Sequence, residues 1–291
     1  GIDTGKTTLT RAIHDHLGGL VLDGDLGQPE IGPPGLISLG SYGNGMKDAY
    51  FVGSFTPRGN LVQVISGIAS LLSLDQENLL IDTDGWIEGD AARIYKGELV
   101  NLVKPDTLIL LQRAEELEKL ATYLAGGKVI NLPAQERREK TRGERTANRI
   151  RNFKYYFSRA RRVEKSWDQL TFAGTLIGKG KVVKRAGLND YFDREILKAW
   201  KYRESLTIIS RGSSASRSEL AEKYDVTDVD VYSTEDLKYR LLGCYRVKEF
   251  VGEGTITQLS PDGIGVLAPE RAFDLVKLGK ERVKPSGRSL Q

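Results

Sequence analysis

The sequence predicts an α/β fold, a mostly parallel sheet with helices on both faces, followed by a smaller β-rich domain. Two observations favour it. In the first half, short apolar runs alternate with segments of helical spacing, as expected for strands and helices that take turns along the chain. From about Leu206 onward, β-like stretches are separated by glycine and proline turns. We therefore expect a first domain over residues 1–200 and a second over residues 201–291.

Each element of the first domain has its own signal in the sequence. The expected strands are apolar runs at 19–25, 48–54, 78–85, 106–112 and 128–133. The expected helices have apolar residues at helical spacing and cover 61–74, 90–103 and 114–124, followed by a basic helix from about Pro133 to Arg162. In such a sheet a ligand lies beyond the carboxyl ends of the strands, so polar residues that follow the strands are the candidate site.

Composition narrows the classes of protein that fit. The chain has 291 residues, of which 40% are hydrophobic and 28% charged, so it can bury a sizeable core. Its single cysteine excludes an internal disulfide, and its two histidines make a zinc site of Cys and His implausible. Any metal should be a hard ion on oxygen ligands. No apolar run approaches the roughly 20 residues of a membrane span, and we expect a cytoplasmic protein without a membrane partner.

The first residues fit a phosphate-binding loop. The Walker A pattern is G-x-x-x-x-G-K-[ST], and Gly5, Lys6 and Thr7 match its end. Lys6 would reach the β- and γ-phosphates of ATP, and the Thr7 hydroxyl would ligate Mg²⁺. The residues expected to bind the nucleotide are Asp3, Thr4, Gly5, Lys6, Thr7 and Thr8. The pattern's first glycine would fall one residue before Gly1, so we expect a strand and at least one loop residue ahead of it. The alternative is a glycine-rich turn that opens an ordinary helix.

Carboxylates follow two of the expected strands. Asp23 and Asp25 end the first, and a carboxylate there can accept a proton from an attacking hydroxyl or orient water or Mg²⁺. Gln28 follows as a neutral donor and acceptor, although a capping aspartate before a turn is the structural alternative. Asp82 ends the strand 78–85 and could hold Mg²⁺ through water, with Asp84 and its neighbour Thr83 beside the γ-phosphate.

Positive charge is concentrated in one segment. Between Pro133 and Lys165 there are 12 Lys and Arg against 4 Glu. Arg138, Arg142, Arg145 and Arg149 are spaced to share one helix face, where like charges destabilise a helix. A mobile arginine-bearing lid over about 133–165 would instead neutralise charge on a transferring phosphoryl group and exclude water. A solvated basic helix is the alternative.

Five ordered motifs together resemble the RNA 5′-hydroxyl polynucleotide kinase family, P-loop kinases of tRNA and rRNA processing with archaeal members. They are the D-T-G-K-T phosphate loop, the D-x-G-Q segment that begins at Asp25, the T-P-x-x-N loop from Thr56 to Asn60, the Gly-Trp pair that contains Trp86, and arginines ahead of the aromatic pair 156–157. The resemblance spans roughly residues 1–165 and implies a P-loop NTPase-type sheet.

The resemblance also implies an activity, an ATP-dependent transfer of the γ-phosphate to the 5′-hydroxyl of RNA, with DNA as a second acceptor. It makes Asp25 the general base and Mg²⁺ the metal, held by Thr7 and Asp82. The residues implied to stabilise the phosphoryl group are Lys6, Arg142, Arg145 and Arg149, and those implied to bind the acceptor are Gln28, Thr56, Asn60 and Trp86. Partners in an RNA-processing complex are implied too, and Arg159, Arg161 and Arg162 could contact RNA phosphates.

Two other functions stay open on the sequence. A partitioning or targeting type of switch ATPase has a similar acidic string after its second strand, but it usually has a second lysine early in the phosphate loop, where this chain has Ile2 or Asp3. A scaffold that binds ATP without turnover in an RNA-processing complex is the third possibility, and the intact Lys6 and Asp25 argue against it.

Overall fold

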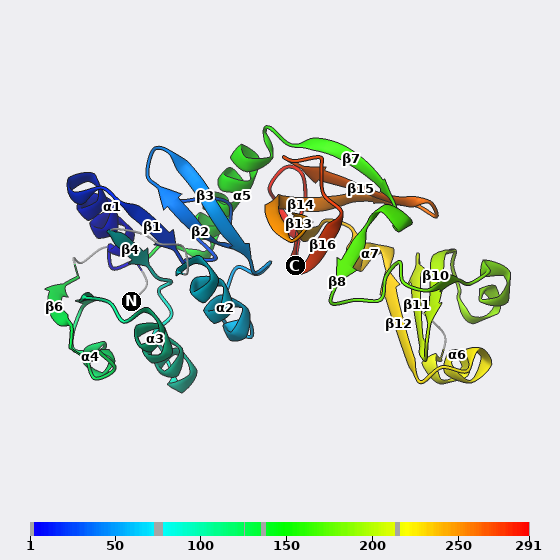
Figure 1. Cartoon of the computed structure of the whole chain (residues 1–291), viewed down its shortest axis with the longest axis horizontal. Helices are drawn as coiled ribbons and strands as arrows, with labels where there is room; N and C mark the ends of the chain where they lie inside the picture. The colour runs from blue at the N-terminus through cyan, green and yellow to red at the C-terminus, as the bar shows by residue number, and fades with distance from the viewer. Residues whose placement is uncertain (1–2, 73–77, 125, 135–137, 213–215, 291) are drawn as a thin grey trace. The chain divides into compact units, whose positions relative to one another are not determined.

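The computed structural model describes residues 3–72, 78–124, 126–134, 138–212 and 216–290 (Figure 1). The chain forms two compact units, Gly1–Asn152 and Phe153–Gln291. The expected loop residues Gly1 and Ile2 and the expected helical residues 73–74 and 135–137 lie outside the described part of the chain.

Unit 1 consists of two small sheets and their helices. Its helices are α1 (Lys6–Leu17), α2 (Leu61–Leu72), α3 (Asp90–Val103), α4 (Glu118–Ala121) and most of α5 (Arg142–Phe157). Its strands are β1 (Leu20–Asp23), β2 (Leu36–Ser41), β3 (Gly45–Phe51), β4 (Leu79–Asp82), β5 (Thr107–Gln112) and β6 (Lys128–Pro133). The α/β class predicted from alternating apolar runs is therefore confirmed. None of the described helices is both long and apolar enough to cross a membrane.

The register of the main sheet brings two acidic strand ends together. The strand order is β3-β2-β1-β4, and β1 runs parallel to β4 with Asp23 opposite Asp82. Helix α2 packs on this sheet through Val64, Ile68 and Leu71, which follow the helical spacing of an apolar face. A fully buried side chain of this kind contributes roughly 1.5–3 kcal/mol. This core fixes the carboxyl ends of β1 and β4, where both strands stop.

Three expectations for unit 1 need correction. Strands β2 and β3 form an antiparallel hairpin beside β1, so among the described strands of unit 1 the parallel pairs are β1–β4 and β5–β6. The helix expected over 114–124 shrinks to α4, because the Glu116 carboxylate accepts the N–H groups of Arg113 and Ala114 and holds them in a turn. The basic helix is shorter than expected too, since α5 ends at Phe157 and the chain enters a strand soon after.

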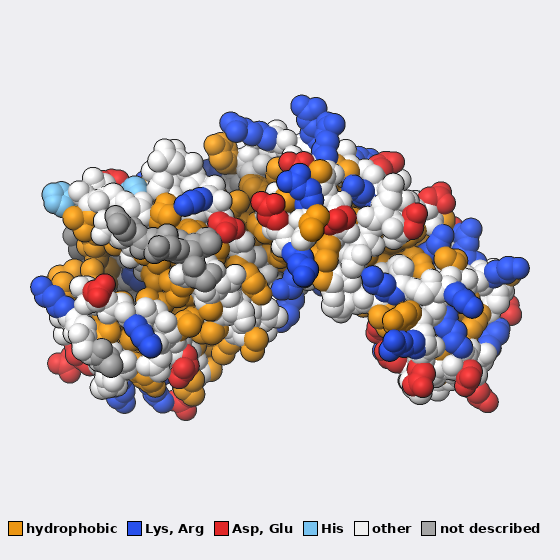
Figure 2. All heavy atoms as spheres, in the orientation of Figure 1, with side chains coloured by type: hydrophobic (Ala, Val, Ile, Leu, Met, Phe, Trp, Pro, Cys, Tyr) orange, Lys and Arg blue, Asp and Glu red, His pale blue; other side chains and the backbone are white. Residues whose placement is uncertain are grey.

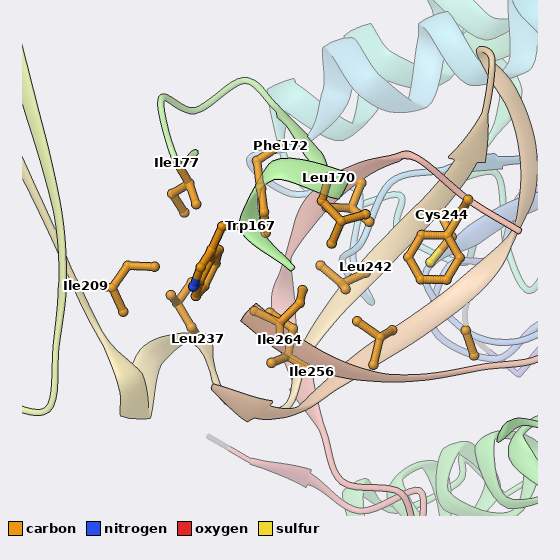
Figure 3. Close-up of a cluster of buried hydrophobic side chains, with 14 of the residues drawn as sticks. Trp167, Leu170, Phe172, Ile177, Ile209, Leu237, Leu242, Cys244, Ile256 and Ile264 are labelled. Atoms are coloured by element: carbon orange, nitrogen blue, oxygen red, sulfur yellow. The ribbon is translucent and has the colours of Figure 1, made fainter. Parts of the chain in front are cut away.

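Unit 2 is built on a seven-stranded and a four-stranded sheet. Its strands are β7 (Arg161–Ser166), β8 (Thr171–Ala173), β9 (Lys181–Val182), β10 (Ile196–Tyr202), β11 (Ser205–Ser210), β12 (Asp228–Ser233), β13 (Arg240–Arg246), β14 (Glu249–Leu259), β15 (Gly263–Ala268), β16 (Leu275–Val283) and β17 (Ser289–Leu290). Its helices are α6 (Arg217–Tyr224) and α7 (Thr234–Leu237), with single turns of 3-10 helix at Trp167–Gln169, Arg185–Gly187 and Asn189–Tyr191. Figure 3 shows a core to which both sheets contribute, in which Trp167 lies among aliphatic side chains from several strands.

The two units meet between Asn152 and Phe153, earlier than the boundary near residue 200 that composition suggested. The reason is strand pairing between distant parts of the sequence. Strand β7 pairs with β15, and β8 pairs with β16. Strands β7 and β8 therefore belong to the C-terminal sheet, whose β-rich character was predicted.

Strand β14 carries a buried acid, Glu253. Its side chain is completely buried, both carboxyl oxygens make no hydrogen bond with a described residue, and its own N–H donates to the Tyr156 hydroxyl at 2.8 Å. Burial raises the pKa of Glu253 well above its ordinary value of 4.5. The folded protein thus keeps this group neutral at a pH where the unfolded chain ionises it.

Glu253 predicts a pH-dependent stability. Above pH 4.5, the unfolded carboxyl loses its proton while the folded one keeps it, so the free energy of unfolding should fall by about 1.4 kcal/mol per pH unit until the raised pKa is passed. Glu253→Gln should make the slope shallower by this amount, and denaturant unfolding between pH 5 and 8 measures it. The exposed acid Glu249 on the same strand supplies the control, since Glu249→Gln should keep the slope. Parallel pH profiles for the wild type and Glu253→Gln would refute this interpretation.

Candidate functional site

The phosphate loop has the backbone that anion binding requires. Gly5 has φ 97° and precedes Lys6, the first residue of α1, while Asp3 has φ 52°. A glycine is favoured at that φ, and it aims the first amides of α1 at the space in front of the helix. Thr4 is buried, whereas Thr8 is exposed. The loop residues expected to bind a nucleotide therefore surround the start of α1.

Asp23 organises the loop that follows β1. Its Oδ1 accepts the N–H of Asp25 at 3.1 Å, and its Oδ2 accepts the N–H groups of Glu30 and Ile31 at 2.7 and 3.2 Å. Burial raises the pKa of Asp23 well above its ordinary range, and the neighbouring carboxylates of Asp82 and Asp25 raise it further. Asp23 thus holds the D-x-G-Q loop in place.

The Asp25 carboxylate is held at one of its two oxygens. Its Oδ1 accepts the N–H groups of Gly27 and Gln28, both at 3.0 Å, in a turn in which a side chain replaces a backbone acceptor. Its Oδ2 accepts no hydrogen bond from any described residue. The sequence left a capping aspartate and a catalytic base as alternatives. One oxygen of Asp25 holds the turn, as a capping aspartate does, and the other is open to a ligand.

The side chains of Thr7, in the first turn of α1, and Asp82, at the end of β4, contact each other. The Thr7 hydroxyl donates a hydrogen bond to the buried Asp82 carboxylate. Burial raises the pKa of Asp82, whereas the Thr7 hydrogen bond and the Lys6 charge act in the opposite direction. A hydroxyl and a carboxylate are oxygen donors of the kind Mg²⁺ prefers. Within the described ranges, no three His, Cys, Asp or Glu side chains form a metal-binding group. An ion here would thus take its remaining ligands from phosphates and water.

The start of α5 is tied to the phosphate loop. The Arg145 guanidinium contacts Asp3 Oδ2 at 2.9 Å, and the Lys140 N–H donates to the same oxygen. Burial acts to raise the pKa of Asp3, but these two hydrogen bonds outweigh it and lower the pKa. The predicted meeting of the arginine segment with the phosphate loop is thus present for Arg145.

Gln28 connects the loop after β1 to α5. Its Nε2 donates to the Arg145 carbonyl at 3.0 Å, and its Oε1 accepts from Asn148 at 3.2 Å. Arg149 lies over the Phe55 ring, 5.3 Å from its centroid, beside the loop 52–60. These contacts bring three separate motifs of the sequence to one place.

The expectation of four arginines on one helix face is wrong for Arg138. That residue precedes α5 and pairs with Glu144 instead. Arg142 is exposed at the first position of α5. Arg145 and Arg149 therefore are the two members of the set that the structure places beside the other motifs.

In the loop 52–60, the two residues expected to bind substrate differ in exposure. Thr56 is exposed, whereas Asn60 is only 3% exposed. The Asn60 amide donates to the carbonyls of Thr56 and Arg58 at 3.0 and 3.1 Å, so it holds the loop closed. The Arg58 guanidinium lies 5.0 Å from the centroid of Trp86 and connects this loop to the turn after β4.

Sequence reasoning missed Lys96, a buried cation at the site. Its Nζ lies 2.9 Å from Asp84 Oδ2 and 2.8 Å from the Asp84 carbonyl, and the Tyr95 hydroxyl donates to the same Oδ2. Burial lowers the pKa of Lys96, while the nearby Asp84 charge opposes that shift. The other oxygen of Asp84 accepts the Trp86 N–H at 2.8 Å. The ion pair therefore holds the turn that carries Trp86, whose ring stacks on Tyr95.

The sequence held only a weak signal for Lys96. Position 96 lies on the apolar face of α3 with Ala92, Leu99 and Val100, where a lysine needs a partner. The partner, Asp84, precedes the helix by only a few residues. A charged residue on an apolar helix face close to an acidic strand end could have identified the pair.

Comparisons with known proteins find a P-loop family and several related kinases. A family model described as mRNA cleavage and polyadenylation factor CLP1 P-loop matches residues 1–159. Among curated relatives, a polyribonucleotide 5′-hydroxyl-kinase of Pyrococcus horikoshii is 27% identical over 99% of this chain and 86% of its own length. A kinase of the same name from Pyrococcus furiosus is 28% identical over 99% of this chain and 87% of its own length. A third, from Methanocaldococcus jannaschii, is 27% identical over 72% of this chain and 64% of its own length.

Proposed function

The chain belongs to the mRNA cleavage and polyadenylation factor CLP1 P-loop family, and we propose that it is an ATP-dependent polynucleotide 5′-hydroxyl kinase. The acceptor is RNA, as the names of the curated relatives suggest, with DNA as a second acceptor. The transferred group is the γ-phosphate of ATP.

The observation that carries the proposal is the Asp25 carboxylate, of which one oxygen is held by the loop and the other is open to a ligand. Two loop amides hold its Oδ1, so the direction of Oδ2 is set before a substrate arrives. A hydroxyl that attacks a phosphoryl group must lose a proton, and a positioned carboxylate can accept it. A switch ATPase needs its acidic residue only to orient water or metal. Gln28 donates its N–H to this carboxylate and its side chain is hydrogen-bonded to α5, an arrangement that favours an acceptor larger than water.

The remaining residues position and stabilise the phosphates. Lys6 and the arginines of α5, Arg142, Arg145 and Arg149, are cations suited to the charge of the transferring group, and closing α5 over the site would exclude water. Thr7 and Asp82 would hold Mg²⁺, which neutralises charge on the β- and γ-phosphates when bound. Asp3, Thr4, Gly5 and Thr8 complete the nucleotide loop.

Four residues are proposed to bind the acceptor. Thr56 is exposed on the loop 52–60, and Asn60 supports that loop from within. Gln28 lies between Asp25 and α5, and Trp86 lies between Tyr95 and Arg58 at the turn after β4. Partners in an RNA-processing complex belong to the same proposal.

A label-transfer assay tests the function and its rivals. The protein is incubated with Mg²⁺, ATP labelled at the γ-phosphate and an oligoribonucleotide with a 5′-hydroxyl end. We expect labelled RNA, and no label on the same oligonucleotide when its 5′ end already carries a phosphate. Label released as free phosphate with none on RNA would favour the switch ATPase. Bound ATP without any turnover would favour the scaffold.

A further inference from the structure

Exposed basic and aromatic side chains surround the turn that joins α5 to β7. Lys154 and Tyr155 lie on the last turn of α5, Arg159 lies in the connection, and Arg161 opens β7. We call these four residues the α5–β7 strip. All are exposed, and 78% of Tyr155 is accessible to solvent. Figure 2 shows blue side chains over this connection.

The positive charge of the strip is not neutralised nearby. The sequence contains no acidic residue between Glu144 and Glu164. Strand β7 pairs with the apolar β15, where Arg161 lies opposite Ala268. Among the described residues, the three cations of the strip form no ion pair, whereas Arg162 pairs with Glu164 and is left out of the strip for that reason.

The backbone beneath the strip is well held. The Ser158 N–H donates to the Tyr155 carbonyl at 3.2 Å, and the Ala160 N–H donates to the Phe157 carbonyl at 3.0 Å. Phe153 and Phe157 are buried and stack on each other, so the opposite face of α5 is anchored in apolar contacts. The exposed residues therefore project from a preformed support.

Neither charge nor exposure alone points to a ligand, but their combination does. A cation on an edge strand such as β7 can simply prevent edge-to-edge pairing, which accounts for Arg161. It does not account for Tyr155, a large aromatic residue held in water beside three unpaired cations. Proteins that bind single-stranded nucleic acids use this combination, because cations contact phosphates and an aromatic ring stacks on a base of any sequence.

We propose that the α5–β7 strip binds single-stranded RNA, through the phosphates of nucleotides other than the 5′-terminal one and through a base stacked on Tyr155. The inference rests on the proposed function, which makes RNA the acceptor. It adds a binding surface that lies apart from the phosphate loop in the sequence. Longer acceptor RNAs should accordingly bind more tightly than short ones.

The charge component is tested by the salt dependence of binding without ATP. A triple variant, Lys154→Gln with Arg159→Gln and Arg161→Gln, is compared with a control that removes three exposed lysines elsewhere in unit 2, Lys181→Gln with Lys184→Gln and Lys248→Gln. Binding to a fluorescent 20-nucleotide RNA is titrated between 50 and 200 mM salt. The strip variant should bind about tenfold more weakly at low salt, and its slope of log affinity against log salt should be shallower by about 2.

The stacking component is tested separately. Tyr155→Leu should weaken RNA binding by about fivefold to a hundredfold without changing the salt slope. The control is Tyr202→Leu, a second exposed tyrosine of unit 2. Equal affinities and slopes for the strip variants and their controls would overturn the proposal. So would a titration in which an acidic peptide binds the strip and the RNA does not. Because these measurements contain no ATP, they give the same result whether or not the protein transfers phosphate.

Discussion

Replacing Asp25 by asparagine is expected to lower kcat for phosphate transfer to RNA by about 10²- to 10⁴-fold, the usual contribution of a general base. The amide keeps an oxygen that can still accept the N–H groups of Gly27 and Gln28, so the loop should keep its shape. It cannot take the proton of the attacking hydroxyl. Label transfer at saturating ATP and RNA measures the loss.

Two measurements keep this result specific to catalysis. Binding of a fluorescent ATP analogue should be unchanged in Asp25→Asn, because the carboxylate is proposed to act on the acceptor. Asp106 is exposed and lies outside the site, so Asp106→Asn should behave as wild type. A kcat within threefold of wild type for Asp25→Asn would rule out Asp25 as the base.

The second large effect is expected on stability. Lys96→Met should lower the free energy of unfolding of unit 1 by about 3–5 kcal/mol, the usual cost of removing one partner of a buried ion pair. The variant leaves the buried Asp84 carboxylate without its cation, and only Tyr95 and the Trp86 N–H still bind it. Denaturant unfolding, followed by the fluorescence of Trp86, measures the loss.

The fluorescence needs a matched background and control. Trp167 and Trp200 are buried in unit 2, so both are replaced by Phe in every protein compared. Lys104→Met makes the same chemical change at the exposed C-terminal end of α3 and should cost less than about 1 kcal/mol. A loss that small for Lys96→Met itself would show that the pair with Asp84 contributes no more than a surface ion pair.

The sequence predicted the elements whose signals are local. Strands β1 and β4 are short apolar runs that end in aspartate, helices α2 and α3 have apolar residues at helical spacing, and all four were found close to the expected residues. The β2–β3 hairpin was not recognised as such. Its strand β2 is buried along its whole length, and its stretch of sequence was interpreted through the D-x-G-Q motif instead.

Contacts between distant parts of the sequence could not be predicted. Strand β7 belongs with β15 because of backbone pairing, which composition does not encode, and this pairing moved the division of the chain to Asn152. In the site, Asp25 follows β1 and Asp82 ends β4. These strands are parallel neighbours, so the polar residues at their carboxyl ends lie at the same edge of the sheet, as the sequence predicted. The link from Arg145 to Asp3 and the Lys96–Asp84 pair depend on side-chain packing. They became visible only in three dimensions.

The position of the transferred phosphate on the RNA tests the proposed kinase activity most directly. A 5′-hydroxyl RNA is incubated with ATP labelled at the γ-phosphate, purified and digested to mononucleotides with a nuclease that leaves 5′-phosphates. All RNA-bound label should be recovered in the 5′-terminal nucleotide as its 5′-monophosphate, and Asp25→Asn should lower its rate of formation by about 10²- to 10⁴-fold. Label found only as free phosphate, or on RNA at any position other than the 5′ end, would contradict the proposed 5′-hydroxyl kinase activity.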